Sequence, residues 1–444
     1  MTSSARTAAW ERAVRSRRLT RALVAAAGAS ALLLSIGVAS AATATSDEKD
    51  EDATRNVLYT DWTTTADFAA GTAEGASAAG DALTIDSVAG TFDYTDPFGD
   101  GSSRAYEYAR WTSQSVDLGF NATEAIPSWS AETPGGTWVQ INMRGVTEAG
   151  NTTKWFILGR WAADDNEIHR TSVSGQGDDD GFVAIDTFVA SDGHAWSSYQ
   201  LQVTLLRPAG TTQTPSVRTV GAVASQLPGK DKAEASTPSG VVKTLDVPQY
   251  SQEMHVGHYP QWDNGGEAWC SPTSTSMVLG YWGVGPAPAD YDWVEPKPHH
   301  DPWVDYAARN TFDYNYDGTG NWPYNTAYAA QFGMNAFVTR LRSLNEAEQF
   351  IAAGIPLVIS ASWKKNEVPG AGYSTNGHLA LIVGFDAAGN PVMNDPFAHT
   401  NDGVRKTFGR AEFEKAWLGH SGGLTYVIHP PGVPLPPAPD QPNW

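Results

Sequence analysis

Glu267-Ala-Trp-Cys-Ser-Pro-Thr-Ser-Thr-Ser-Met-Val-Leu279 is the stretch of sequence that decides the fold expected for the second half of the chain. Ser271 can cap a helix and Pro272 suits a first helical turn, so we predict a helix over residues 271–281. Cys270 then meets the positive end of the helix dipole, which favours a thiolate. A thiolate is the form that a cysteine nucleophile requires.

Cys270 is the only cysteine among the 444 residues. A single cysteine cannot close an intrachain disulfide. The alternative to a nucleophile is an inert, buried thiol, which is common for free cysteines. The position at a predicted helix start favours the nucleophile.

A second motif follows at residues 376–385, Asn-Gly-His-Leu-Ala-Leu-Ile-Val-Gly-Phe. This apolar run predicts a buried strand, and the turn at 386–390 returns the chain as a hairpin. His378 then lies opposite Asp395 or within two residues of it. A carboxylate there can fix the tautomer of the imidazole and leave its other nitrogen for the thiol. Asn394 points to the opposite face of the sheet from Asp395, so only one of the two can do this.

The order of these motifs resembles the stand-alone bacterial relatives of the bacteriocin-processing peptidases, which form family thirty-nine of the cysteine peptidases. The resemblance covers about residues 242–429 and implies a papain-like fold. It implies Cys270 as nucleophile, His378 as general base and Asp395 as the residue that orients the histidine. It further implies a peptide or protein substrate and hydrolysis of peptide bonds without a cofactor.

The same resemblance implies a glutamine upstream of the cysteine that donates to the oxyanion. The segment 247–252 points to Gln252 for this role. Gln252 lies eighteen residues before Cys270, a longer gap than the family usually keeps. Residues 253–269 must therefore loop out, and Gln261 is a rival donor.

The region from 57 to 221 has a β pattern. Short runs alternate apolar with polar residues, Gly, Asp, Asn and Pro clusters separate them, and no long helical period interrupts. The pattern predicts an all-β sandwich of jelly-roll type, as an accessory domain. The clearest runs are 138–143, 155–158, 182–185 and 199–205.

The second domain, 242–429, mixes helical with extended patterns and is predicted to be α+β. Residues 222–241 are rich in Ser, Pro, Lys, Glu and Ala and predict a linker. The Pro-rich tail, 430–444, predicts an unstructured end. The predicted helices are 271–281, 303–309 and 344–353, and the predicted strands are 356–360, 378–385, 392–394 and 424–428.

Residues 1–41 have the pattern of a signal peptide. Five arginines between residues 12 and 21 precede an apolar run at 22–38 and the small residues Ala39-Ser-Ala41. Export by the general or the twin-arginine route is open. Residues 42–56 predict an acidic flexible leader. We expect a secreted, extracellular protein without a membrane span after cleavage.

The formal charge of the chain is −20, and it is close to −25 without residues 1–41, which carry six Arg and one Glu. A field of this sign repels nucleic acid and anionic lipid, so neither is expected as a partner. Abundant Ala and Gly, and Arg in excess of Lys, suggest a bacterial source with a GC-rich genome.

Two weaker motifs concern metal ions. Residues 313–318, Asp-Tyr-Asn-Tyr-Asp-Gly, match the first half of an EF-hand loop, but Tyr324 stands where the loop needs Glu, so an Asx-rich turn is the alternative. The pairs His255/His258 and His299/His300, with Asp301 next to the second pair, could ligate a metal. The chain has no His-Glu-x-x-His motif and no cysteine cluster, so no metal or cofactor is predicted.

The β-rich half is also rich in tryptophan. Aromatic side chains on a sheet can bind sugar, but they more often form the core. If these side chains bind sugar, the partner of this half is the cell wall or a carbohydrate. The tryptophans concerned are Trp111, Trp129, Trp138, Trp155, Trp161 and Trp196.

Three functions follow in order of support from the residues. The first is a secreted bacterial cysteine peptidase with a Cys270–His378–Asp395 triad, Gln252 and a β-sandwich module. The second is an inactive protein that binds cell wall or carbohydrate. The third keeps the site but acts on wall peptides as an amidase or transpeptidase.

Overall fold

The structure, a computed structural model, describes residues 54–444. The predicted signal peptide and residues 42–53 of the predicted leader lie outside the described residues. Within residues 54–444, no helix is long and apolar enough to cross a membrane.

The N-terminal half contains two seven-stranded antiparallel sheets and one short helix, α2 (Thr65–Ala69). The first sheet contains β1 (Asn56–Trp62), β3 (Ala76–Ala79), β4 (Ala82–Ile85), β8 (Glu124–Glu132), β11 (Gly181–Ala184), β12 (Thr187–Ala190) and β14 (Ser216–Gln226). The second contains β2 (Thr72–Glu74), β5 (Gly90–Thr95), β6 (Ser103–Thr112), β7 (Val116–Ala122), β9 (Trp138–Thr147), β10 (Phe156–Trp161) and β13 (Trp196–Pro208). The predicted β-rich region is confirmed, whereas a jelly-roll path remains a prediction.

The tryptophans of this half lie mostly in the core. Five of them, Trp111, Trp129, Trp138, Trp161 and Trp196, are at most 1% exposed. The idea of a sugar-binding platform is therefore wrong for these five, because a buried ring cannot stack on a ligand. Trp155 is half-buried, and the guanidinium of Arg144 lies 4.5 Å from its ring centre.

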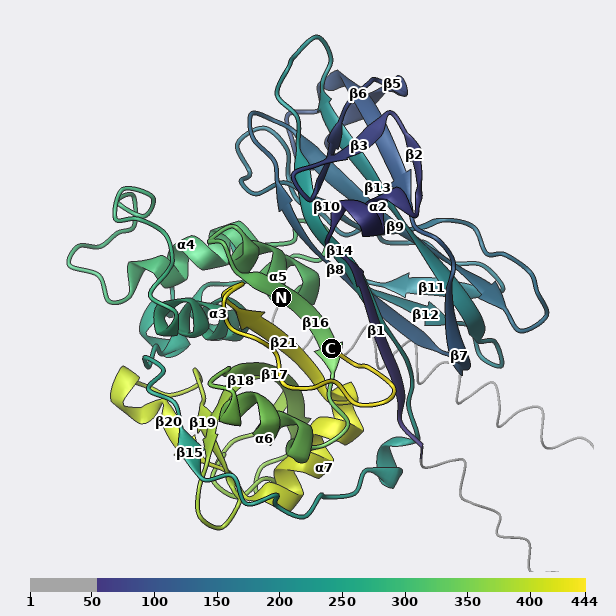
Figure 1. Cartoon of the computed structure of the whole chain (residues 1–444). Helices are drawn as coiled ribbons and strands as arrows, with labels where there is room; N and C mark the ends of the chain where they lie inside the picture. The colour runs from purple at the N-terminus through teal and green to yellow at the C-terminus, as the bar shows by residue number, and fades with distance from the viewer. Residues whose placement is uncertain (1–53) are drawn as a thin grey trace, which may run out of the picture.

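The C-terminal half is built on a third antiparallel sheet. Its strand order is β16-β21-β17-β18-β19-β20, and β15 pairs with β18. Figure 1 shows α3, α4 and α5 on one side of this sheet and α6 and α7 on the other. The strands are β15 (Lys243–Thr244), β16 (Asn335–Arg340), β17 (Leu357–Trp363), β18 (Thr375–Phe385), β19 (Pro391–Asn394), β20 (Arg405–Thr407) and β21 (Leu424–His429). The helices are α3 (Cys270–Tyr281), α4 (Pro302–Thr311), α5 (Trp322–Ala330), α6 (Leu344–Ala352) and α7 (Arg410–Ser421).

The hairpin of β18 and β19 has the register predicted from the sequence. Leu381 faces Asn394 and Phe385 faces Pro391, with a bulge between Ile382 and Gly384. The three predicted helices are present as α3, α4 and α6. The sequence patterns did not predict α5 or α7, because their apolar residues do not follow a clear helical stripe.

The two halves share one buried cluster of side chains rather than standing apart. Tyr324 of α5 packs between Trp129 and Trp161, with ring centres 6.0 and 5.4 Å away, and its hydroxyl donates to the carbonyl of Arg160 at 3.0 Å. Arg309 of α4 holds Asp165 in an ion pair at 2.7 Å. The core of the C-terminal half therefore continues into the first sheet of the N-terminal half.

Two segments predicted to lack structure are packed instead. Strand β14 continues through residues 222–226, and Ser236 of the predicted linker donates to Glu414 at 2.8 Å. At the end of the predicted unstructured tail, Asn443 is fully buried and donates to the carbonyl of Arg340 at 2.8 Å. Composition predicted flexible segments here, but specific side-chain hydrogen bonds hold both in place.

Candidate active site

Cys270 is the first residue of α3, one position earlier than the predicted helix start. The indole of Trp269 before it is buried and donates to the carbonyl of Trp262 at 2.7 Å, which fixes the entry to the helix. Residues 271–279 are all buried, while Cys270 itself is half-buried. The sulfur therefore lies at an accessible helix start, beside backbone N–H groups without partners in the helix.

His378 belongs to β18 and pairs with Ala361 of β17. Its Nε2 lies 2.8 Å from Oδ1 of Asp395, and Cys270 is close enough to the ring to help raise its pKa. The bond to Asp395 occupies Nε2, so Nδ1 is the nitrogen left for the thiol. The structure thus brings Cys270, His378 and Asp395 together from three separate segments.

Asp395 is fully buried and has four partners besides its own backbone contacts. Besides His378, Lys406 lies 2.9 Å from Oδ2, the hydroxyl of Tyr373 donates at 3.1 Å, and the backbone N–H of Phe397 donates to Oδ1 at 3.0 Å. Burial alone would raise the pKa of Asp395, but His378 and Lys406 outweigh it and lower the pKa to about 2. The group is therefore a carboxylate at neutral pH.

The pKa of His378 moves in the opposite direction. Burial would lower it, but hydrogen bonds to Asp395 and Cys270, and the charges of both, raise it to about 9. The imidazole is therefore protonated at neutral pH and can donate a proton to a leaving group.

Aromatic rings surround the histidine. Trp363 and Tyr373 approach it edge-on, with ring centres at 5.9 and 5.8 Å, and Phe397 lies at 6.4 Å. Burial and the charge of Asp395 raise the pKa of Tyr373, so its hydroxyl stays a donor. Neither Tyr373 nor Lys406 was predicted from the sequence. Lys406 lies on β20, which pairs with β19, so only the pairing of a further strand could have indicated it.

Asn394 faces away from the histidine. Its amide donates to the carbonyl of Pro248 at 2.9 Å, and its carbonyl accepts from Arg405 at 2.6 Å. Of the two neighbours that the sequence left open, Asp395 is the one that contacts His378.

The two candidate glutamines differ in their surroundings. Gln252 is 2% exposed and opens the short helix η3 (Gln252–His255), and its amide donates to the carbonyl of Glu267 at 2.8 Å. Gln261 is exposed in the loop at residues 256–265. The contact with Glu267, three residues before Cys270, favours Gln252 as the residue near the thiol.

The residues considered for metal binding have separate outcomes. Asp313 accepts hydrogen bonds from the backbone of Ser172, Asn315 and Tyr316, which is the Asx-turn alternative to a calcium loop. His300 is exposed. Asp301 accepts from Asn401 at 2.7 Å. The remaining candidates, His255, His258 and His299, lie together around Asp305, which the sequence did not indicate.

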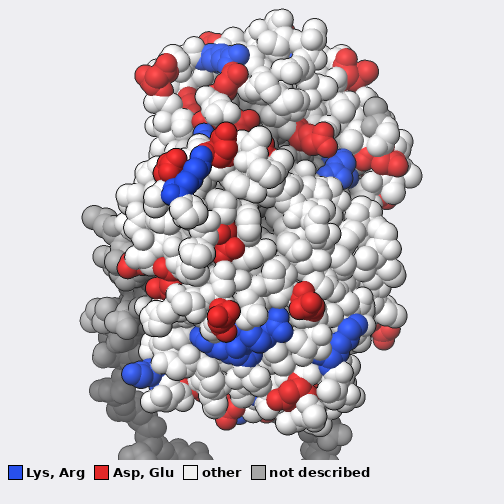
Figure 2. Space-filling view, turned by 90° about the vertical axis from the view of Figure 1, so that its left-hand side faces the viewer, with Lys and Arg blue, Asp and Glu red and all other residues white. Residues whose placement is uncertain are grey.

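Charges on the face of the molecule shown in Figure 2 are spread rather than gathered in one acidic patch. In Figure 2, acidic side chains are scattered over the visible face, and the largest basic group forms a band in its lower part. Large areas between them carry no charge.

Comparisons with known proteins place both halves of the chain near one peptidase group. Residues 58–225 match the family model of the peptidase C39 N-terminal domain, and residues 244–423 match that of the C39-like peptidase family. The chain is a relative of the C39 peptidases. This confirms the resemblance inferred from the Cys and Gly-His motifs, and a relation to the C39 peptidases indicates a cysteine peptidase family.

A search of solved structures also finds matches. One of them is the crystal structure of a C39-like peptidase from Bacillus anthracis. It is 17% identical in sequence to this C39 relative, and the match covers 42% of the present chain and 96% of the Bacillus chain at a TM-score of 0.27. A search of curated proteins finds no match. The assignment to the C39 group therefore rests on the two family models.

Proposed function

We propose that this C39 relative is a secreted cysteine peptidase of papain-like fold, with Cys270 as nucleophile, His378 as general acid and base, and Asp395 as the orienting carboxylate. One observation carries the proposal: the ring of His378 is hydrogen-bonded to Asp395 through Nε2 and interacts with the helix-start Cys270 closely enough to raise the pKa of the imidazole. This is the arrangement of nucleophile, base and orienting acid that acyl transfer requires.

The reaction would run in two steps. The Cys270 sulfur attacks the peptide carbonyl carbon, a C–S bond forms, and the C–N bond of the tetrahedral intermediate breaks while His378 gives its proton to the leaving amine. Water then attacks the thioester, His378 takes a proton from that water, and the carboxylic acid leaves as the C–S bond breaks. Asp395 stays ionised and stabilises the imidazolium throughout.

The oxyanion of each tetrahedral intermediate needs donors. The backbone N–H of Cys270, at the start of α3, is one candidate, and the side-chain amide of Gln252 is the other. The amide of Gln252 has two N–H groups, and the carbonyl of Glu267 uses one of them. The second N–H is the one that would donate to the oxyanion.

The proposal extends to location and to the N-terminal half. The signal-peptide pattern of residues 1–41 supports export. The shared core around Tyr324 supports a role for the β-rich half in bracing the catalytic half. The relation to the C39 peptidases supports a peptide or protein as substrate. Cell-wall contact would have to use surfaces other than the five buried tryptophans.

Labelling of the single cysteine tests the proposal directly. Iodoacetamide modifies one defined residue, so the loss of free thiol reports Cys270 alone. We expect rapid labelling of wild type, slow labelling of His378→Ala and normal labelling of the control His194→Ala, whose side chain lies in the N-terminal half. Hydrolysis of a peptide library by wild type should disappear in Cys270→Ala.

Each other outcome selects an alternative. If Cys270 is labelled slowly in wild type and no peptide is cleaved, the protein is an inactive binding protein. If the thiol is reactive but only wall peptides react, by amide hydrolysis or transfer to an amine, the amidase or transpeptidase is correct.

A further inference from the structure

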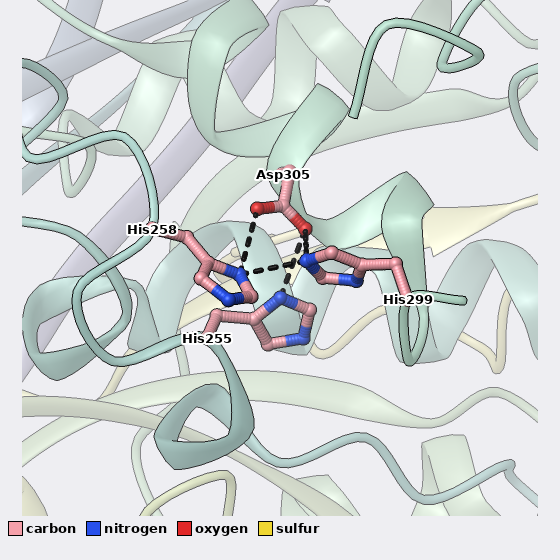
Figure 3. Close-up of side chains that lie close together, drawn as sticks. All are labelled: His255, His258, His299 and Asp305. Atoms are coloured by element: carbon pink, nitrogen blue, oxygen red, sulfur yellow. Dashed lines mark hydrogen bonds and ion pairs between the residues drawn. The ribbon is translucent and has the colours of Figure 1, made fainter. Parts of the chain in front are cut away.

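Three histidines and one aspartate meet beside the active site, from three segments of the C-terminal half. Figure 3 shows His255, His258 and His299 turning ring nitrogens toward the carboxylate of Asp305. His255 ends η3, His258 follows in the next turn, His299 precedes α4, and Asp305 lies in α4. One ligand atom from each of the four lies within 4.8 Å of all the others.

Within the cluster, ring nitrogens and carboxylate oxygens that could bind a metal lie close to one another. Nδ1 of His255 lies 2.9 Å from Oδ2 of Asp305, and Nδ1 of His258 lies 3.4 Å from Oδ1. Nε2 of His299 lies 3.5 Å from Oδ2 of Asp305 and 2.7 Å from Nδ1 of His258. In a tetrahedral site with metal–nitrogen distances of about 2.0–2.1 Å, ligand atoms stand about 3.3 Å apart, a value that lies within the range of these four separations.

The protein alone does not satisfy these groups. Asp305 is fully buried, and its Oδ1 accepts no hydrogen bond. Among residues 54–444, its ion-pair partners are the three histidines, without Lys or Arg. Nε2 of the fully buried His255 also lacks a partner. A buried carboxylate with an unused oxygen costs several kcal/mol unless a positive charge compensates it.

We propose that His255, His258, His299 and Asp305 bind one divalent transition-metal ion, with zinc as the first choice. Three imidazoles and one carboxylate suit zinc, whereas calcium and magnesium prefer oxygen ligands alone. His299 has the outer contact that metal-bound histidines usually have, because its Nδ1 faces the backbone carbonyl of His300. Its Nε2 is then the free lone pair inside the cluster.

Four protein ligands close the coordination shell, so the ion is structural and not catalytic. It joins η3, the loop before α4, and α4 itself. The helix η3 begins with Gln252 and ends with His255, and the ring of His255 lies 6.0 Å from that of Trp269, the residue before Cys270. The ion would therefore brace the long insertion between Gln252 and Cys270. The metal site itself does not depend on the proposed function, whereas its role in bracing the segment between Gln252 and Cys270 does.

Metal content of the tag-free full chain tests the site. After removal of metal with dipicolinate and incubation with zinc sulfate, we expect one zinc per chain by plasma mass spectrometry and a rise in Tm over the stripped protein. Cobalt in place of zinc should give the intense visible bands of a tetrahedral site. These readouts need no substrate, so they can fail while the peptidase proposal stands, and the reverse.

Variants locate the ion. We expect His258→Ala and His299→Ala to lower zinc affinity roughly 100-fold or more and to lose the cobalt bands, while the exposed neighbour variant His300→Ala binds like wild type. Retention of one zinc with wild-type affinity in His258→Ala and His299→Ala would overturn the proposal. So would stripped wild type that takes up no zinc and shows no change in Tm, a result that does not depend on how any variant folds.

Discussion

Nε2 of His378 lies 2.8 Å from Oδ1 of Asp395, and that carboxylate is fully buried. His378 lies in β18, and Asp395 directly follows β19, the strand that pairs with β18, so β pairing brings the two residues close together. The carboxylate can hold the imidazole in one orientation and stabilise its charged form, which neither residue could do alone.

Asp395→Asn should lower kcat/KM by about 10²–10⁴-fold with a smaller change in KM. The amide cannot stabilise the imidazolium, and it can donate to Nε2 and impose the wrong tautomer. Steady-state kinetics on a peptide substrate, together with circular dichroism, measure the effect. The control is Asp402→Asn in the short helix η5 (Asn401–Gly403), which should be as active as wild type.

The pH profile should follow His378. Its pKa of about 9 means that the protonated acid is lost as pH rises through that value. We therefore expect kcat/KM to fall on the alkaline side with a midpoint near 9, and this midpoint should move down in Asp395→Asn. A midpoint near 6.5 in wild type would contradict the coupling between the two residues.

The stability of the protein should depend on the same group. The folded pKa of His378 is raised from 6.5 to about 9, so its stabilising contribution is complete below about pH 6.5 and is lost as pH rises to about 9. The difference in unfolding free energy between wild type and His378→Gln should shrink over this range by roughly 3 kcal/mol. Urea unfolding at pH 6 and pH 9.5 measures it, and a constant difference would refute the shift.

The sequence predicted those site residues whose positions follow from local secondary structure. Cys270 precedes a helix-start pair, and His378 and Asp395 share a hairpin whose register follows from the turn. Lys406 and Tyr373 have no such signal, because β20 and the loop before β18 bring them to Asp395 only in the folded sheet.

Elsewhere, tertiary packing differs from what the composition predicted. The Pro-rich composition of the tail predicted an unstructured end, yet Asn443 is buried against Arg340. Asp305 could not be paired with the histidines from sequence, since it lies 47 positions after His258 in the chain and no turn pattern sets their distance. The β-rich region was predicted from alternation, but its joint core with α5 depends on contacts between distant segments.

Lys406→Met should destabilise the protein by about 1–3 kcal/mol at pH 7, because it leaves a buried carboxylate oxygen short of a partner. The variant leaves Oδ2 of Asp395 with only the hydroxyl of Tyr373, so the pKa of Asp395 should rise from about 2. A lowered carboxylate pKa stabilises above about pH 3.8 and is lost toward pH 2, so acid unfolding should begin at a higher pH in the variant. The exposed Lys415→Met on α7 is the matched control, and equal acid midpoints for both variants would contradict the role of Lys406.

Tyr324→Ala should destabilise both halves together by about 3–5 kcal/mol, because it opens a cavity between Trp129 and Trp161. Tyr324→Phe removes only the hydrogen bond to Arg160 and should cost about 1 kcal/mol. Hydrogen exchange followed in the sheets of both halves during urea unfolding should give one shared transition in wild type. Two separate transitions would mean that the halves fold independently.

Gln252→Ala and Gln261→Ala distinguish the two candidates for the oxyanion donor. Gln252 is buried in η3 and tied to Glu267 close to Cys270, whereas Gln261 is exposed in the loop that follows. Loss of one oxyanion donor typically lowers kcat by about 10²–10³-fold, because the interaction forms with the transition state and not with the bound substrate. We expect this loss for Gln252→Ala with KM within about twofold of wild type, and no change for Gln261→Ala.

Gln252→Glu keeps the size but replaces the donor with a negative charge, so it should be as inactive as the alanine variant. If Gln261→Ala lost activity and Gln252→Ala kept it, the loop at 256–265 would have to close over Cys270 when substrate binds.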